Sequence, residues 1–301
     1  MPLWIPITLV AAFLQNIRSS LQKYLKGRMG TTGATFVRFG FGMPFVLVLV
    51  GILHFYSGYA FPPIGPRFLV WVTVGALSQI AATFVLVHLF SFRNFAVGTA
   101  YSRTEPVQAA ILGLIFLGEG ISKPAVAAIA ISMVGVMLIS VARDKFSLTA
   151  LITSLGQRIA VLGLISGAFF GLSAVSYRAA SLALAGPNFI MQGAVTLAFS
   201  ISIQTMTMMI WMYLREPDQF ALIRKAWRSS LIVGIVGATA SFGWFTAMTL
   251  QNAAIVKALA QVELIFTFAT TVFFFREKIN RLEVLGCLFV VAGILVLVLF
   301  R

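Results

Sequence analysis

The sequence predicts an all-α polytopic membrane protein with ten transmembrane helices, arranged as two inverted five-helix repeats around a central cavity. Three observations lead to this prediction. Apolar types make up 60% of the 301 residues and charged types only 10%, whereas a soluble domain has about 25% charged residues. The apolar residues form runs of the length, about 20 residues, that a helix needs to cross the bilayer. The second half of the chain also repeats part of the first half.

Ten apolar runs, separated by charged residues, glycine and proline, are the expected spanning helices. They are continuous and do not alternate in polarity, which excludes a strand barrel. The first run lacks the basic segment and cleavage site of a signal peptide, so we expect it to be retained. The segments between the runs are too short for a soluble domain and can form only linkers. The runs are 3–25, 33–56, 68–91, 95–117, 123–142, 158–184, 188–214, 229–251, 253–275 and 280–300.

The internal repeat appears when the two halves are aligned at a shift of 158 residues. The segment EPVQAAILGLIFLGEGI then aligns without gaps on ELIFTFATTVFFFREKI, so that Glu105 and Glu119 recur as Glu263 and Glu277. Chance matches between apolar helices would rarely reproduce two glutamates at one separation. We infer a first repeat over 1–142, a linker over 143–157 and a second repeat over 158–301.

Loop charges predict that the two repeats insert in opposite directions, as an odd number of helices per repeat requires. The loop after the seventh run contains Arg215, Arg224, Lys225 and Arg228, whereas the equivalent loop of the first repeat contains only Arg67. By the positive-inside rule, the odd-numbered loops are cytoplasmic and both termini lie outside. We therefore expect a multi-pass protein of a bacterial inner (plasma) membrane.

Two segments, TEPVQAAILGLIFLGEGIS and AQVELIFTFATTVFFFREKINRLEVLGCLFVVAGILVLVL, resemble the ends of the repeats in EamA-type members of the drug/metabolite transporter superfamily. The matching positions are Leu117-Gly118-Glu119 and Phe275-Arg276-Glu277. The resemblance implies ten helices in inverted repeats, a central cavity and alternating access. It leaves the cargo open among amino acids, sugars, nucleotide-like metabolites and drugs. The chain departs from the common pattern at Arg103 and Glu105, before Pro106, where many relatives are apolar.

Charges inside the runs suggest what is transported. A charged residue at the bilayer centre costs about 2.5–3.5 kcal/mol, so such residues should face a cavity or each other. Inverted repeats are a recurring plan of secondary transporters, and we expect an exporter. Cations outnumber acids inside the runs, which favours a small anionic or zwitterionic organic metabolite as its substrate. Two alternatives stay open: a proton-coupled drug or quaternary-cation exporter that uses Glu105 or Glu263, and a lipid-headgroup carrier or scramblase. The cations are Arg18, Arg38, Arg103, Arg178 and Lys257.

Arg103 and Lys257 are the strongest candidates for contact with cargo. In the repeat, Arg103 aligns with Gln261 and Thr99 aligns with Lys257, so each half presents one cation on the equivalent helix face. The pair could hold a carboxylate or phosphate. The competing interpretation is ion pairing with Glu105 or Glu263, either as structural bridges or as sites that exchange protons.

Polar and aromatic residues in other runs complete the candidate substrate site. Gln15 and Arg18 share one face of the first helix, and Tyr101, Tyr177 and Trp244 lie within spanning runs. Arg38, near the start of its run, is expected to extend toward the membrane surface. The glycines at 163, 167 and 171 have the spacing that lets two helices approach closely, and we assign them to internal packing.

Several classes of activity have no support in the residues. One cysteine, Cys287, and two histidines exclude a disulfide framework and make a metal site unexpected. No phosphate-binding loop or hydrolase motif is present, so we predict no cofactor and no enzymatic activity. The net charge of +14 is interpreted as loop charge facing anionic lipid rather than nucleic acid. The expected partners are a small-molecule substrate and membrane lipids, with a monomer expected and a dimer left open.

Overall fold

The computed structural model describes residues 2–89, 95–144, 158–186, 188–273 and 281–300, and the regular structure in these ranges is helical. Seven stretches of the described residues are long and apolar enough to cross a membrane, which makes the protein an all-α, multi-pass membrane protein. The elements are α1 (Trp4–Lys26), α2 (Thr31–Gly40), α3 (Gly42–Gly51), η1 (Ile52–Tyr56), α4 (Pro66–Leu89), α5 (Phe95–Ser102), α6 (Glu105–Leu117), α7 (Lys123–Asp144), α9 (Arg158–Ala183), α10 (Phe189–Arg215), α11 (Asp218–Lys225), α12 (Trp227–Leu250), α13 (Ala253–Leu259), α14 (Val262–Phe273) and α15 (Arg281–Leu299).

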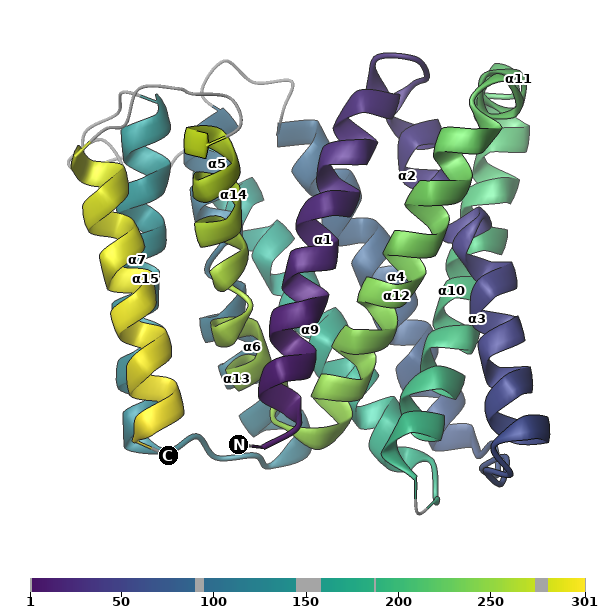
Figure 1. Cartoon of the computed structure of the whole chain (residues 1–301), viewed down its shortest axis with the longest axis horizontal. Coiled ribbons are helices and arrows are strands. Elements are labelled where there is room, and N and C mark those ends of the chain that lie inside the picture. The colour runs from purple at the N-terminus through teal and green to yellow at the C-terminus, as the bar shows by residue number, and fades with distance from the viewer. Residues whose placement is uncertain (1, 90–94, 145–157, 187, 274–280, 301) are drawn as a thin grey trace. The chain divides into compact units, whose positions relative to one another are not determined.

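The chain forms two compact units, which we call unit 1 and unit 2. Unit 1 comprises Met1–Leu77 and Ser176–Leu250, and unit 2 comprises Ser78–Val175 and Gln251–Arg301. Two of the three boundaries fall inside long helices, α4 and α9, and the third lies at the end of α12. Each unit therefore takes helices from both sequence repeats, so helices far apart in the chain pack against each other within one unit (Figure 1).

Three of the ten predicted runs are not among the seven span candidates. The helix α1 is long enough, but its polar residues, among them Gln15, Asn16 and Arg18, lower its hydropathy. The prediction of continuous helices over 95–117 and 253–275 is wrong. Each of these runs is broken, into α5 and α6 and into α13 and α14.

The first break has a local cause in the sequence. Proline has no backbone N–H and disfavours helical geometry in the residue before it, and Pro106 stands in the first turn of α6. The second break, at Ala260 and Gln261, contains no proline. Helix termini predicted for the other runs agree with the structure to within a few residues.

A short helix, α11, lies within the stretch 215–228, where only a linker was expected. Its first turn contains Asp218 and its last turn Arg224 and Lys225, which matches the helix dipole at both ends. The side-chain oxygen of Gln219, the residue after Asp218, accepts a hydrogen bond from the N–H of Gly30 over 2.9 Å. This bond attaches α11 to the start of α2. The predicted linker over 143–157 lies almost entirely outside the described residues.

The equivalent helices of the two repeats, α7 and α15, run antiparallel in direct contact (Figure 1). A Cβ at Gly135 would lie 2.6 Å from the carbonyl oxygen of Gly286, and one at Gly293 would lie 2.8 Å from that of Ala128. Gly293 is the repeat equivalent of Gly135, and Gly286 is that of Ala128. The same contact is thus made twice with the roles exchanged, which is the signature of a local twofold axis.

The row of glycines on α9 packs inside unit 2, as predicted. A Cβ at Gly167 would lie 2.9 Å from the carbonyl oxygen of Ser102, and one at Gly171 would lie 3.0 Å from the amide nitrogen of Ala109. The absence of side chains on this face lets α9 approach the backbone of α5 and α6 on both sides of the break. Close approach between small residues is a major source of helix association in membranes.

Candidate functional site

The two breaks in unit 2 occur at equivalent positions of the repeat. The N–H of Arg103 donates to the carbonyl of Ala100 over 3.1 Å, and the N–H of Gln261 donates to the carbonyl of Ala258 over 3.2 Å. Both bonds span three residues instead of the four of an α-helix, and both pairs of residues correspond at the shift of 158. Each repeat therefore interrupts its fourth helix at the same point.

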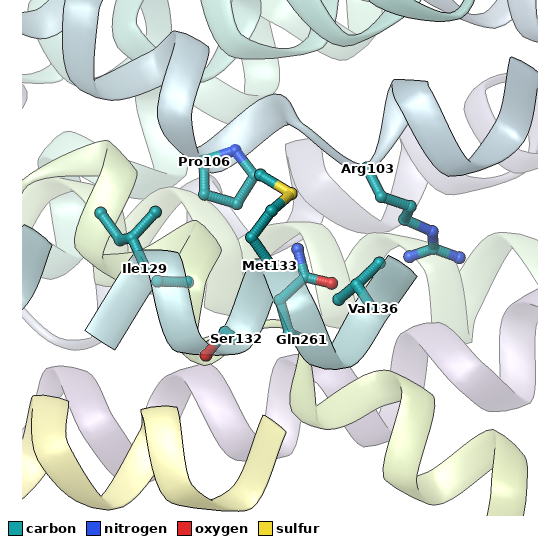
Figure 2. Close-up of a pocket in the computed structure, with 8 residues that line it drawn as sticks. Arg103, Pro106, Ile129, Ser132, Met133, Val136 and Gln261 are labelled. Carbon is teal, nitrogen blue, oxygen red and sulfur yellow. The ribbon is translucent and has the colours of Figure 1, made fainter. Parts of the chain in front are cut away.

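A small pocket in unit 2 contains side chains from both breaks (Figure 2). Gln261 extends into the group of residues around Met133, whereas the guanidinium of Arg103 lies at its edge. The space is about large enough for one water molecule, so an organic solute requires the surrounding helices to move. The pocket is lined by Arg103, Pro106, Ile129, Ser132, Met133, Val136, Ala258 and Gln261.

Arg103, Ser132 and Gln261 are the polar residues among the mostly apolar side chains that line this pocket. Gln261 is buried, and its Oε1 has no hydrogen-bond partner among the described residues. Arg103 is half-buried, and none of the acidic residues in the described ranges forms an ion pair with it. A cation and an unused amide at a helix break can bind a polar group that a closed, apolar pocket would reject.

The other predicted cation, Lys257 of α13, is engaged elsewhere. Its Nζ lies 2.8 Å from Oε1 of Glu105 at the start of α6. This ion pair joins the first segment of one broken helix to the second segment of the other. Glu263, the other acid considered as an ion-pair partner for the two cations, is half-buried in the first turn of α14.

A second contact between the repeats lies at the other end of α13. The side chain of Asn252 caps this helix, with its Oδ1 accepting from the N–H of Ala254 over 2.9 Å. Its Nδ2 donates to Oε2 of Glu119 over 2.9 Å. Glu119 follows α6, so residues of the first repeat hold α13 at both ends.

Three predicted substrate residues in unit 1 take part in hydrogen bonds between helices. The indole Nε1 of Trp244 donates to Oε1 of Gln15 over 2.9 Å. The hydroxyl of Tyr177 accepts from Ser200 over 2.8 Å and from Gln204 over 3.0 Å. Trp244 and Tyr177 are both buried. The third aromatic candidate, Tyr101 of unit 2, packs in an apolar cluster with Ala100 and Ala160.

The arginines of unit 1 occupy two different kinds of site. Arg178 donates from Nη1 to the carbonyl oxygens of Met248 over 2.7 Å and Thr249 over 3.4 Å, at the C-terminal end of α12, where cations are favoured. Arg18 is buried and lies beside Arg38. The expectation that Arg38 extends to the membrane surface is wrong, because its Nε is buried.

Sequence reasoning identified Arg103 and Gln261 but missed the break at Gln261 and the α7 residues that line the pocket. The pair Arg103 and Pro106 was a signal for the first break. The alignment of Gln261 with Arg103 was a signal for the second. Among the described residues, no group of histidine, cysteine, aspartate and glutamate has an arrangement that could hold a metal ion.

Comparison with known proteins identifies the family. The model of the EamA-like transporter family matches residues 2–141 and again residues 157–299. The chain belongs to the EamA-like transporter family. Its members are secondary transporters and not enzymes, so this chain is a multi-pass transporter of a small-molecule substrate. The two matches cover the two halves in which the sequence repeat was found.

A solved structure supports the fold. A chain described as "Crystal structure of protein" is similar to this one with a TM-score of 0.72 and 16% identity, over 99% of this chain and 96% of that chain. At this identity the likeness establishes the fold and nothing about the substrate. No curated protein matches the chain.

Proposed function

We propose that this transporter exports a small anionic or zwitterionic organic metabolite by alternating access, with the substrate meeting the two helix breaks of unit 2. The observation that supports this most is the coincidence of the breaks at equivalent residues, Arg103 and Gln261. Discontinuous helices at equivalent places in two repeats are a common way to form a substrate site near the bilayer midplane. Irregular backbone at that depth is tolerated where it lines a cavity.

Inverted repeats, one over 1–142 and one over 158–301, are the architecture that this mechanism requires. The antiparallel contact of α7 with α15, made twice with the roles of the repeats exchanged, supports the inversion. When two halves of similar sequence take two slightly different shapes, exchanging those shapes moves the access path from one side of a central cavity to the other. The tight pocket in unit 2 fits a conformation in which this path is closed.

The charge of the substrate is inferred from Arg103. Its repeat equivalent is the neutral Gln261, so the two-repeat site has one cation and one amide at corresponding positions. The other cation of the two broken helices is balanced, because Lys257 pairs with Glu105. A guanidinium binds a carboxylate with two parallel hydrogen bonds, and the amide supplies a further donor or acceptor.

Solute counterflow in proteoliposomes tests this function. Purified protein should exchange labelled amino acids or hydroxy acids across the membrane, and Arg103→Gln should lower the rate at limiting substrate about 10-fold or more, as expected for the loss of a hydrogen bond to a charged group. Arg67→Gln removes an exposed charge and is the matched control. Exchange of quaternary cations alone would contradict the anionic substrate and favour the proton-coupled drug exporter, and movement of labelled lipid alone would favour a scramblase.

The direction of insertion has its own test. The loop charges favour a topology with both termini outside the cytoplasm, and an inner membrane of a bacterial cell is the proposed location. A pair of reporters fused after Arg301, one active only in the cytoplasm and one only outside it, should show activity only for the second. Cytoplasmic activity would reverse the assigned orientation and leave the transport proposal intact.

A further inference from the structure

The side chains of two arginines in unit 1 pack against the same glycine. Arg18 belongs to α1 and Arg38 to α2, and both helices pack against α12. A Cβ at Gly237 of α12 would lie 3.2 Å from Cδ of Arg18 and 3.4 Å from Cγ of Arg38. Because Gly237 has no side chain, the aliphatic portions of both arginine side chains can pass close to the backbone of α12 at this point.

Arg38 has no acidic partner among the described residues. Its Nε is buried without a hydrogen bond, and the like charge of Arg18 lies beside it. The only acids in the sequence of unit 1 are Glu216 and Asp218. Glu216 accepts a hydrogen bond from the hydroxyl of Thr32, which lies six residues before Arg38, or about 9 Å along the helix.

Such an arrangement is costly within a membrane. A buried cation without a counter-charge loses hydration. The Phe39 ring, whose centroid lies 4.9 Å from Cζ of Arg38, replaces that hydration only in part, and the like charge of Arg18 adds repulsion. The cost falls when an anion enters between the two groups, since a guanidinium offers donors in a planar fork that fits two oxygen atoms. The pair therefore produces a local positive potential that favours an anionic ligand.

Hydrogen-bonded polar and aromatic side chains lie on one side of the two arginines. Tyr177 interacts electrostatically with Arg38, and its hydroxyl is held by Ser200 and Gln204. The ring of Tyr177 stacks against Phe245, with centroids 4.3 Å apart and an angle of 35° between the planes. Polar atoms fixed by their own hydrogen bonds, next to aromatic rings, are typical of sites that orient a small organic ligand.

We propose that Arg18 and Arg38 form a second anion subsite, in unit 1, that binds the carboxylate group of solutes of the transported class independently of the Arg103 pocket. This inference rests on the proposed function, because it takes the chemical class of the ligand, a small organic acid, from it. A carboxylate suits the subsite better than a phosphate. It is planar and carries one negative charge, and the side chains beside it are aromatic as well as polar.

The test compares acids with their amides. L-leucine, L-lactate, leucinamide and lactamide are added to the purified full chain, and thermal unfolding is followed at constant ionic strength and pH. Ligand binding raises the melting temperature in a concentration-dependent way. The acids should stabilise the wild-type protein, and the amides should bind about 10- to 100-fold more weakly because they lack the charged acceptor. This comparison needs no variant, so a misfolded mutant cannot obscure it.

Variants then assign the effect to the subsite. Arg38→Gln should weaken binding of the acids about 10- to 100-fold and leave the amides unchanged, and Arg38→Lys should give an intermediate loss because it keeps the charge without the planar fork. Arg28→Gln removes an exposed charge and should change neither. Size-exclusion chromatography checks that each variant stays folded.

The outcomes separate this inference from the proposed function. Equal binding of acids and amides, equal effects of Arg38→Gln on both, or stabilisation by inorganic phosphate but by neither acid would overturn the carboxylate subsite. Stabilisation of the wild type by neither acid would overturn it as well. Stabilisation by acids without any counterflow in proteoliposomes would leave the subsite in place and contradict the transport proposal.

Discussion

The ammonium of Lys257 lies 2.8 Å from the carboxylate of Glu105, and this ion pair connects the two broken helices of unit 2. The side chains are 23% and 19% exposed, respectively, so water screens the pair in part. In the repeat, Thr99 stands where the other half has Lys257, and the partner position has Glu263. The same charged contact therefore cannot form in the second copy, and the pair makes the two halves different.

A double-mutant cycle should measure the strength of this ion pair. We expect Glu105→Gln and Lys257→Met each to lower the free energy of unfolding by about 1–3 kcal/mol, below the range for fully buried pairs because both groups are partly hydrated. The double variant should lose less than the sum of the two by about 1–2 kcal/mol. Thermal unfolding in detergent is the measurement, and strictly additive losses would show that the contact contributes nothing.

Close approach of α7 and α15 should depend on the glycine at position 135. A Cβ there would lie 2.6 Å from a backbone carbonyl oxygen, which cannot turn aside as a side chain can. We expect Gly135→Ala to destabilise the protein by about 1–3 kcal/mol through overpacking. Gly51→Ala is the control, since a Cβ at that position meets nothing within 4 Å. Equal melting temperatures for the two variants would contradict the tight α7–α15 contact.

The cap of α13 should contribute to stability through Asn252. Asn252→Ala removes the acceptor for the N–H of Ala254 and the donor to Glu119, so we expect a loss of about 1–2 kcal/mol. Asn188→Ala is the matched comparison, because Asn188 caps α10 in the same way. Combined with Glu119→Gln, the change at Asn252 should be non-additive and the change at Asn188 additive. Additivity in both cases would argue against the link between the repeats.

The hydrogen bond between Trp244 and Gln15 should hold α12 to α1. Trp244→Phe keeps the aromatic packing and removes the N–H donor, at an expected cost of about 1 kcal/mol. Trp211→Phe removes an indole that is 44% exposed and should cost less than half as much. Unfolding followed by circular dichroism compares the two, and a smaller loss at position 244 than at 211 would contradict this contact.

The sequence predicted the helical character of the chain, its internal repeat and the family resemblance because these depend on composition and on spacing along the chain. It could not predict the second break at Gln261, because no proline or glycine marks it and the residues before and after it favour a helix. It named Arg103, Gln261 and Lys257 as cations and polar groups inside the membrane. It left open which of them would be neutralised by an acid.

Partners across the fold could not be chosen from spacing alone. Arg38 and Arg178 both stand inside apolar runs and look alike in sequence, yet one lies beside a second arginine and the other caps the end of α12. The difference depends on Gly237 and on the C-terminal end of α12, residues distant in the chain. Only packing brings them within reach.

The order of residues was enough to establish that this chain spans a membrane in two related halves, because hydropathy and repetition are properties of the chain itself. Tertiary structure decided that Lys257 is neutralised by Glu105 while Arg103 lines a pocket, and that Arg18 and Arg38 share the space above Gly237. The physical reason is that the energy of a charge in a membrane depends on what surrounds it. Those surroundings are assembled from helices that are separated by about 150 to 220 residues in the sequence.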